Sequence, residues 1–214
     1  MAARAKHRDR IVRTAARLFR RDGYAATGTN DIVAASGAPK GSLYHYFPDG
    51  KAQIAAEAVG YAAGKVTRTL ADLAARPGHP ADAVRAYGAL LAGWLAQSGF
   101  RDGCPITTTL LELAPAEAAV TAAGQAAFDG WTAIFAAALA AAGVRPAQAR
   151  TLALTAIAAF EGALILARVA RSPQPIEEVT AEIARLFELT AAPQFELFAA
   201  EEAADKGKLQ PRGG

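Results

Sequence analysis

Apolar residues recur at helical spacing along most of the chain. One stripe with spacing i, i+4, i+7, i+8 predicts a helix over about 6–21 that ends at Gly23. The members of this stripe are Ile11, Ala15, Leu18 and Phe19. Further helices are predicted over 30–36, 40–46, 52–75, 81–97, 105–113, 116–142, 146–171 and 176–190. Val, Ile, Thr and aromatic residues show no sustained period-two alternation, so the pattern predicts an all-α protein.

Two of the predicted helices are short and flank a tight turn. The helical pattern is interrupted at Gly37-Ala38-Pro39, between 30–36 and 40–46. This is the spacing of a helix-turn-helix. Thr29 is placed to cap the first of these helices. Pro39 suits the first position of the second helix, because its missing N–H would have no partner there.

The second short helix has an apolar side and a polar side. Leu43 and Phe47, four residues apart, are predicted to anchor it inward. The remaining positions face outward and carry groups that suit nucleic acid: a lysine for phosphate, a glycine for close approach, and hydroxyl or ring donors. These positions are Lys40, Gly41, Ser42, Tyr44, His45 and Tyr46. The alternative is that the aromatic residues form the core of a small helical domain.

Charge supports a polyanion partner at the N-terminal end. Residues 1–50 carry nine basic and four acidic side chains, whereas the whole chain of 214 residues has a net charge of only +3. We interpret the arginines of the first helix as phosphate-attracting groups. A solvated basic helix face is the alternative interpretation.

Composition narrows the cellular setting. Apolar residues make up 52% of the chain, much of it alanine, and Cys104 is the single cysteine, which fits a reducing cytoplasm. No apolar segment follows the basic N-terminus, which argues against a secretory signal. The apolar stretch 151–167 is short for a membrane span and contains Glu161, so we expect a buried helix rather than a membrane segment.

We call residues 1–50 the reader. A specific set of residues marks this region: Phe19, Gly23-Tyr24, Thr27, Ile32, Gly37 and the run Lys40-Gly41-Ser42-Leu43-Tyr44-His45-Tyr46-Phe47. These residues resemble the DNA-binding region of the TetR family of bacterial transcriptional regulators, and the resemblance covers about the first quarter of the chain. It implies a homodimer in which three N-terminal helices carry the helix-turn-helix and a variable helical domain binds a small effector. Residues 1–50 and 51–200 are the expected domains, with a disordered tail at 201–214.

Two short segments resemble the LmrA/YxaF-like branch of that family. One is Phe47-Pro48-Asp49-Gly50-Lys51, which reads as a one-residue insertion, and the other is Gly103-Cys104-Pro105-Ile106. Gly28 stands where many relatives have Ser or Thr, so the helix cap is assigned to Thr29 or shared with Thr27. With the outward positions above, the expected DNA-binding set also includes Thr27, Thr29, Asn30, Pro39 and Lys51.

Large side chains on the central helices predict an effector pocket for a hydrophobic ligand. The expected pocket residues are Tyr61, Trp94, Phe100, Cys104, Thr107, Thr108, Leu111, Phe128, Trp131 and Phe135. The alternative is that the aromatic residues fill the core.

A stripe of small residues near the C-terminus predicts a four-helix dimer interface, with burial inside the monomer as the alternative. Its expected members are Ala156, Phe160, Ala163, Leu164, Ala167, Ile183 and Phe187.

An enzyme or a helical interaction module is the rival class. The three histidines, His7, His45 and His79, lie in unrelated contexts without metal-ligand spacing, and Cys104 has no evident basic partner. We therefore expect no metal and no cofactor. The resemblance to the TetR family implies a repressor that leaves a palindromic operator when a small hydrophobic effector binds.

Overall fold

The protein is a bundle of helices with a smaller helical unit at one end. The computed structural model describes residues 2–39, 41 and 43–191, and in that part of the chain it contains helices and no strand, which confirms the all-α prediction. The helices are α1 (Ala2–Asp22), α2 (Thr29–Ser36), α3 (Leu43–Tyr46), α4 (Gly50–Ala74), α5 (Pro80–Gln97), α6 (Thr107–Leu113), α7 (Ala118–Ala141), α8 (Pro146–Ala170) and α9 (Gln174–Ala191).

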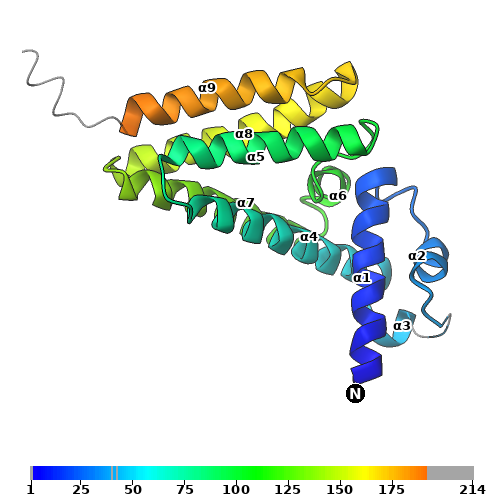
Figure 1. Ribbon diagram of the computed structural model, residues 1–214. Coiled ribbons are helices and arrows are strands. Elements are labelled where there is room, and N and C mark those ends of the chain that lie inside the picture. Colours follow the sequence, from blue (N-terminus) through cyan, green and yellow to red (C-terminus); the bar gives the residue numbers. More distant parts are fainter. Residues whose placement is uncertain (1, 40, 42, 192–214) are drawn as a thin grey trace, which may run out of the picture.

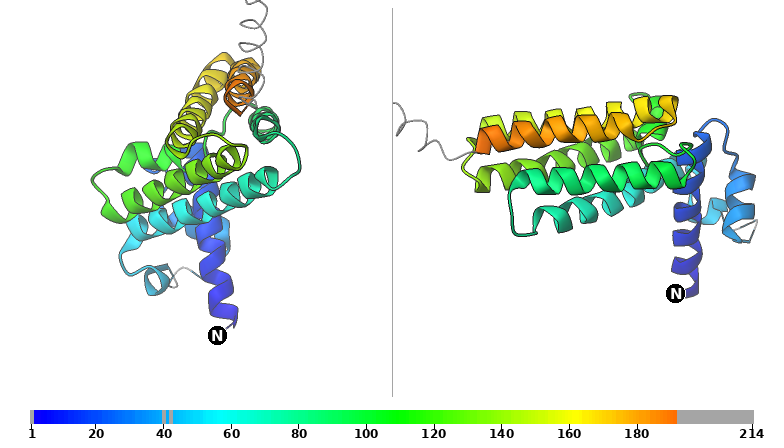
Figure 2. Two further views of the ribbon diagram at one scale, coloured as in Figure 1. Left: turned by 90° about the vertical axis from the view of Figure 1, so that its left-hand side faces the viewer. Right: turned by 45° about the horizontal axis from the view of Figure 1, so that its top comes forward.

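The long helices form two layers. Figure 1 shows α4 and α7 side by side below α5, α8 and α9, with α1 crossing them steeply at one end. The second view in Figure 2 shows α2 on the far side of α1 from the bundle. The helix α4 belongs to both parts, because it begins beside α3 and then runs along α7.

The N-terminal unit is held by a small apolar core. Ile11 and Phe19 of α1, Ile32 of α2, Leu43 of α3 and Phe47 are buried almost completely. The predicted stripe of α1 therefore faces inward as its spacing required. Burial of such side chains stabilises the unit by roughly 1.5–3 kcal/mol each.

Two helix starts differ from the prediction. The helix α3 begins at Leu43 rather than at residue 40, and Gly41 has 3-10 conformation, so Pro39 is not its first residue. Thr29 is the first residue of α2 rather than its cap. Residues 201–214, predicted to be a tail, lie outside the described residues.

Helix α8 is apolar enough to cross a membrane by length and composition alone, since its most apolar window has a mean hydropathy of 1.8. In the fold, one side of α8 packs against α7 and α9, and its Ala153, Ile157 and Phe160 are buried. The apolar residues on that side of α8 are therefore used in packing within the bundle.

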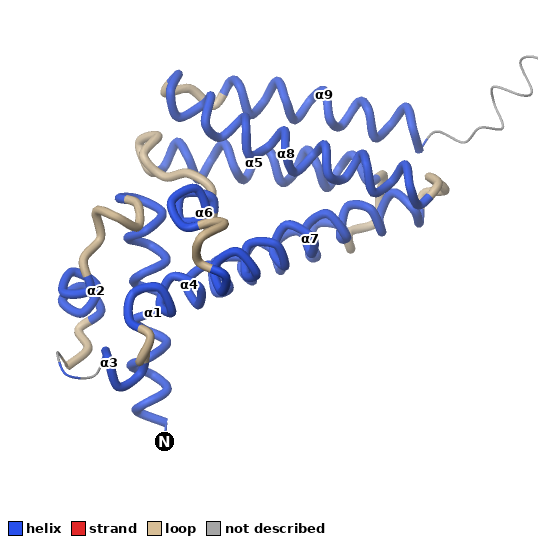
Figure 3. The backbone as a smooth tube through the Cα atoms, turned by 180° about the vertical axis from the view of Figure 1, so that it is seen from behind, coloured by secondary structure: helices blue, strands red, loops and turns tan. Residues whose placement is uncertain are grey.

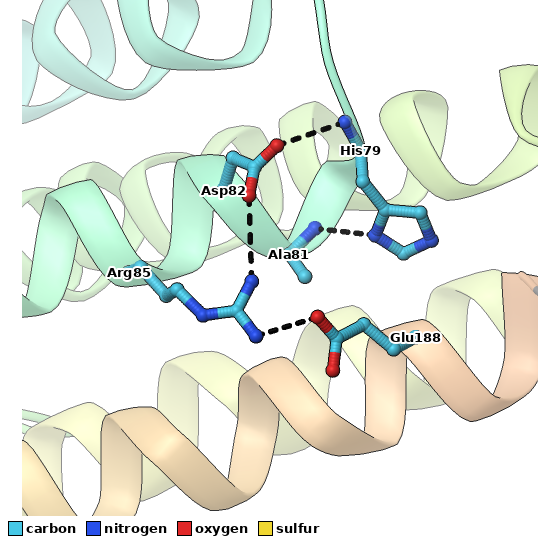
Figure 4. A network of polar contacts seen from close by, with 5 residues as sticks. All are labelled: His79, Ala81, Asp82, Arg85 and Glu188. Atoms are coloured by element: carbon cyan, nitrogen blue, oxygen red, sulfur yellow. Dashed lines mark hydrogen bonds and ion pairs between the residues drawn. The ribbon is translucent and has the colours of Figure 1, made fainter.

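Helices α5 and α9 cross at close range. A Cβ atom on Gly88 of α5 would overlap the side chain of Thr180 of α9. One turn before Gly88 on α5, Arg85 donates to Glu188 across 2.5 Å and to Asp82 across 3.3 Å (Figure 4). His79 caps α5 by accepting from the Ala81 amide through Nδ1 (Figure 4). Since the Arg85 and Glu188 side chains are nearly half exposed, the ion pair contributes little, and the close crossing sets the geometry.

Candidate DNA-binding surface and effector cavity

The start of α2 is fixed by Asp31 rather than by a threonine cap. Gly28 occupies the cap position, and its amide donates to Asp31 Oδ2 across 2.9 Å. The Asp31 carboxylate thus accepts an amide that has no partner within the helix. Thr29 is already the first helical residue, so the predicted cap at Thr29 was wrong.

Thr27 is a structural residue of the loop between α1 and α2. Its side chain is buried, and its hydroxyl donates to the Gly23 carbonyl across 2.8 Å. That hydroxyl therefore closes the loop instead of facing outward. Gly37 closes the next turn with φ +63°, and its amide donates to the Ala34 carbonyl.

The outward side of α3 carries two of the predicted aromatic residues. Tyr44 is 67% exposed and His45 is also exposed. Tyr46 is half-buried, and its ring meets Phe47 edge-on with 6.5 Å between ring centres. The core interpretation therefore applies to Tyr46, which packs against the core. Tyr44 and His45 face solvent, and their contact with DNA stays a prediction.

The other predicted DNA-contacting positions separate into three groups. Asn30, Pro39 and Gly41 are exposed on the same unit, whereas Lys40 and Ser42 lie outside the described residues. Lys51 does not extend outward: its ammonium lies 4.0 Å from the centre of the Tyr24 ring. Partial burial lowers the pKa of Lys51.

The arginines of α1 have two different roles. Arg8 pairs with Glu57 across 2.6 Å, and Arg10 donates to the Gly37 carbonyl across 3.0 Å, so both hold the reader together. Arg13, Arg17 and Arg20 line a cavity on the bundle side of α1. These three arginines therefore lie on the cavity, and their attraction of phosphate stays a prediction.

This cavity has a volume of about 850 Å³ and lies between α1, α4, α5, the loop after α5 and α8. Tyr61, Trp94 and Cys104 line it, as the sequence predicted. Tyr87, Leu91 and Glu161 also line it and were not predicted. Tyr87 and Leu91 fall within the helix predicted over 81–97, and spacing alone does not separate a cavity wall from a core contact.

The aromatic residues of α7 fill the core instead of lining this cavity. Trp131 is buried and donates through Nε1 to Thr67 across 3.1 Å. Phe128 packs edge-on against Trp131 with 5.4 Å between ring centres, and Phe135 packs on Phe187 at 6.1 Å. These contacts satisfy both the rings and the indole N–H within the fold, so the core interpretation holds for α7.

Four more predicted pocket residues also lie off the cavity lining. Leu111 is 76% exposed on α6. Phe100 and Thr108 are partly buried, and Phe100 has φ +62° in the loop that follows α5. Thr107 acts on the cavity indirectly, because its hydroxyl donates to Glu161 Oε2 across 2.8 Å.

The inner end of the cavity is polar. The Glu161 carboxyl is hydrogen-bonded by the Thr107 hydroxyl and the Cys104 thiol. Burial raises the pKa of Glu161 despite these bonds, and burial together with the nearby Glu161 carboxyl raises the pKa of Cys104. The thiol is accordingly neutral at physiological pH, which does not suit a nucleophile.

Helix α6 joins the cavity to the reader. Beyond Thr107 at its start, Glu112 near its end accepts hydrogen bonds from the backbone amides of Tyr24 and Ala25 across 2.7 and 2.6 Å. Arg20 of α1 also pairs with Asp102 in the loop before α6. Figure 3 shows α6 lying between α1 and the long helices, where these contacts are made.

The residues predicted to form the dimer interface do not form an exposed surface. All of its members are buried within the single chain. Those members are Ala156, Phe160, Ala163, Leu164, Ala167, Ile183 and Phe187. The opposite side of α8 is instead apolar and exposed, with Leu154 at 54%, Ile165 at 56%, Leu166 at 58% and Val169 at 80%, and Leu189 of α9 at 65%.

A short helical reader joined by one long helix to a bundle with a cavity defines a ligand-responsive helix-turn-helix regulator. Residues 11–58 match the family model described as bacterial regulatory proteins, tetR family, and residues 80–182 match the LmrA/YxaF-like transcriptional regulator C-terminal domain. The chain belongs to the TetR family of DNA-binding transcriptional regulators, with a C-terminal domain of the LmrA/YxaF-like type.

Individual relatives agree with this assignment over most of their length. An HTH-type transcriptional regulator of Mycobacterium tuberculosis H37Rv is 36% identical over 84% of this chain and 93% of its own. The regulator LmrA of Bacillus subtilis is 30% identical over 81% of this chain and 92% of its own. A TetR transcriptional regulator from Chloroflexus aurantiacus superposes with a TM-score of 0.74 at 32% identity, covering 86% of this chain and 96% of that one.

Proposed function

We propose that this regulator is a cytoplasmic repressor that binds a palindromic operator as a homodimer and leaves it when a small, largely apolar effector enters the cavity. The observation that carries the proposal is the composition of the cavity wall, which combines α1 of the reader with α4, α5 and α8 of the bundle. A ligand in this cavity touches both parts at once. Its binding energy therefore depends on how the reader is placed against the bundle.

The exposed apolar side of α8 supports the homodimer. Two copies of Leu154, Ile165, Leu166 and Val169 facing one another would remove large apolar side chains from water, as a twofold interface requires. Such a dimer carries two copies of α3. Palindromic DNA presents its half-sites in successive major grooves about 34–36 Å apart, so only one spacing of the readers binds well.

Coupling between the cavity and DNA has two physical routes. Helix α4 lines the cavity with Tyr61 and begins next to α3 at Gly50. Helix α6 contacts Glu161 through Thr107 and the reader loop through Glu112. A change in cavity shape on ligand binding shifts the separation between the two readers of the dimer. The free energy of DNA binding then weakens by the coupling free energy, typically about 1–3 kcal/mol.

Selection of bound fragments from random duplex DNA tests this function. We expect a palindromic sequence to be enriched, and we expect its affinity to fall steeply with salt, by a log–log slope of roughly 0.9 for each phosphate contact. Recovery of no sequence preference, or an affinity that salt leaves unchanged, would contradict a sequence-specific regulator. The purified complex then serves to find compounds that release the DNA.

An enzymatic role finds less support in the same residues. Cys104 is a neutral thiol, and its hydrogen-bonding neighbours at the cavity end are Glu161 and Thr107, with no basic side chain among them. Within the described residues, no group of three or more His, Cys, Asp or Glu side chains is placed to hold a metal ion. We therefore propose that ligand binding, rather than ligand turnover, is the task of this cavity.

A further inference from the structure

We propose that the effector is an amphipathic anion, with an apolar body held by α5 and α8 and one acidic group held between α1 and α4. The inference deepens the proposed function and rests on it. It names the chemical class of the ligand and the residues that select it.

The first argument is the charge at the mouth of the cavity. Four exposed cationic residues line the cavity, and we call them the cationic rim: Arg13 and Arg17 of α1, and Lys65 and Arg68 of α4. Within the described part of the chain, none of the four forms an ion pair. Their neighbour Arg20, in contrast, is neutralised by Asp102.

The rim therefore holds more positive charge than the carboxylates beside it can balance. Asp72 is the acidic residue that lines the same region and, among the described residues, it too lacks an ion-pair partner. Four cations against one carboxylate leave a local excess, and like charges brought together by the fold repel each other. A ligand carboxylate, phosphate or sulfonate removes that repulsion and accepts charge-assisted hydrogen bonds from the guanidinium groups.

The second argument is the apolar middle of the cavity. Tyr61, Leu91, Trp94 and Leu164 line it, and Trp94 remains 42% exposed. An indole left in water on a concave wall offers a large apolar contact to a ligand. The volume of about 850 Å³ accommodates a body the size of two fused aromatic rings or a medium-length acyl chain.

The third argument is the polar inner end of the cavity, which determines how the ligand is oriented. Glu161 lies there, so a ligand acid placed beside it would face another carboxyl group. The same acid placed at the cationic rim meets four cations. The ligand is thereby oriented with its acidic group outward against α1 and with its apolar body or a hydrogen-bond donor toward Glu161.

The position of the rim separates this interpretation from a role in DNA binding. Figures 1 and 2 show α2 on the opposite side of α1 from α5, and the cavity lies on the α5 side. Arg13 and Arg17 are among the residues that line this cavity. Phosphate contact by these arginines is an alternative that the test below addresses.

Two dyes with one aromatic skeleton provide the test. 8-Anilinonaphthalene-1-sulfonate carries an acidic group, and N-phenyl-1-naphthylamine has the same rings without it. Fluorescence titration of the DNA-free, full-length protein measures both affinities. We expect the double variant Arg17→Gln/Arg68→Gln to weaken the sulfonate dye roughly tenfold, because charge-assisted hydrogen bonds are lost, and to leave the neutral dye within about twofold.

A matched control removes a cation elsewhere. Arg76→Gln lies on the exposed turn after α4, outside the cavity lining, and is expected to change neither dye. Displacement of the sulfonate dye by dodecanoate but not by 1-dodecanol is the second expected result. Helical circular dichroism and the thermal midpoint establish that each variant is folded.

The outcomes separate the two proposals. Equal losses for both dyes in the double variant, no binding of either dye, or equal displacement by the acid and the alcohol would overturn the anionic class. Weaker DNA binding in the double variant with unchanged dye affinities would assign the rim to phosphate instead and would also overturn it. A charge-selective cavity in a protein that enriches no DNA sequence would leave the ligand class standing and remove the repressor function.

Discussion

Glu112 and Tyr24 are 88 residues apart in sequence, and the carboxylate of Glu112 accepts the backbone amide of Tyr24 across 2.7 Å. Its second oxygen accepts the amide of Ala25 across 2.6 Å. The two amides belong to the loop just after α1, where no helical partner is available to them. The side chain of one bundle residue thus satisfies the backbone of the reader directly.

We predict that Glu112→Ala loosens this loop locally without unfolding the protein. Hydrogen exchange of the Tyr24 and Ala25 amides should accelerate at least fivefold, since a hydrogen bond to a charged group is worth about 1 kcal/mol or more even where it is partly exposed. Exchange measured by NMR checks this. Glu117→Ala removes an exposed carboxylate further along the chain, and it should leave both amides unchanged. Equal acceleration in both variants would show that the hydrogen bonds to Glu112 do not protect the loop.

Tyr44→Ala should weaken DNA binding while the fold stays intact. The side chain is 67% exposed, so its loss should change the free energy of unfolding by less than about 0.5 kcal/mol. Loss of one phosphate or base contact should lower DNA affinity about five- to tenfold. Leu43→Ala, next to it but buried, should instead cost about 2–5 kcal/mol of stability. Chemical denaturation paired with DNA titration distinguishes the two residues, and unfolding of Tyr44→Ala would place this ring in the core.

Val169→Glu on α8 should convert the dimer into a monomer. Val169 is 80% exposed in the single chain, and a carboxylate there would be desolvated and placed near its own copy across a twofold interface. Sedimentation velocity should show at least a tenfold weaker association at micromolar concentration. Leu111→Glu introduces the same charge at an exposed leucine on α6 and should leave the dimer unchanged. If Val169→Glu remains dimeric, the interface lies elsewhere.

Glu161→Gln should alter the pH dependence of stability. Burial raises the folded-state pKa of Glu161 above its ordinary value of 4.5, so the folded state holds this proton more tightly than the unfolded state. The contribution of the protonated Glu161 to the free energy of unfolding is fully present below pH 4.5, and it is lost as the pH rises through the raised pKa. The glutamine variant stays neutral and can still accept from Thr107. It should therefore gain on the order of 1 kcal/mol over the native protein at pH 8 and lose that advantage toward pH 4.5.

Urea unfolding at several pH values measures the difference. Glu178→Gln, exposed on α9, is the control and should show no such trend. A constant difference between Glu161→Gln and the native protein across this range would mean that the carboxyl group does not change its ionisation on folding.

Periodicity predicted the helices well because each helix has a face that must be buried. Ile11 and Phe19 define the inner side of α1 whatever the rest of the fold does. Gly37 predicted a turn for an equally local reason, since its φ of +63° favours a residue without a side chain.

The sequence pattern could not predict which element each helix face packs against. Helix α8 is apolar on both sides, and spacing alone did not reveal whether Phe160 or Val169 faces its own chain. The same limit applied to Trp131, whose indole N–H is satisfied by Thr67, 64 residues away. Arg17 lay on a predicted basic face, but its place in the same cavity lining as Arg68 depends on how α1 crosses α4. Sites assembled from several helices are therefore visible only in the fold.

The close approach of Gly88 to Thr180 determines which wall of the cavity is free to move. Tyr87, Leu91 and Trp94 lie on the same helix as Gly88, and a helix packed this closely on α9 has little room to shift. We therefore expect the α5 wall to stay in place when a ligand binds. We expect the displacement to fall on α1, α4 and α6, which are the elements attached to the reader.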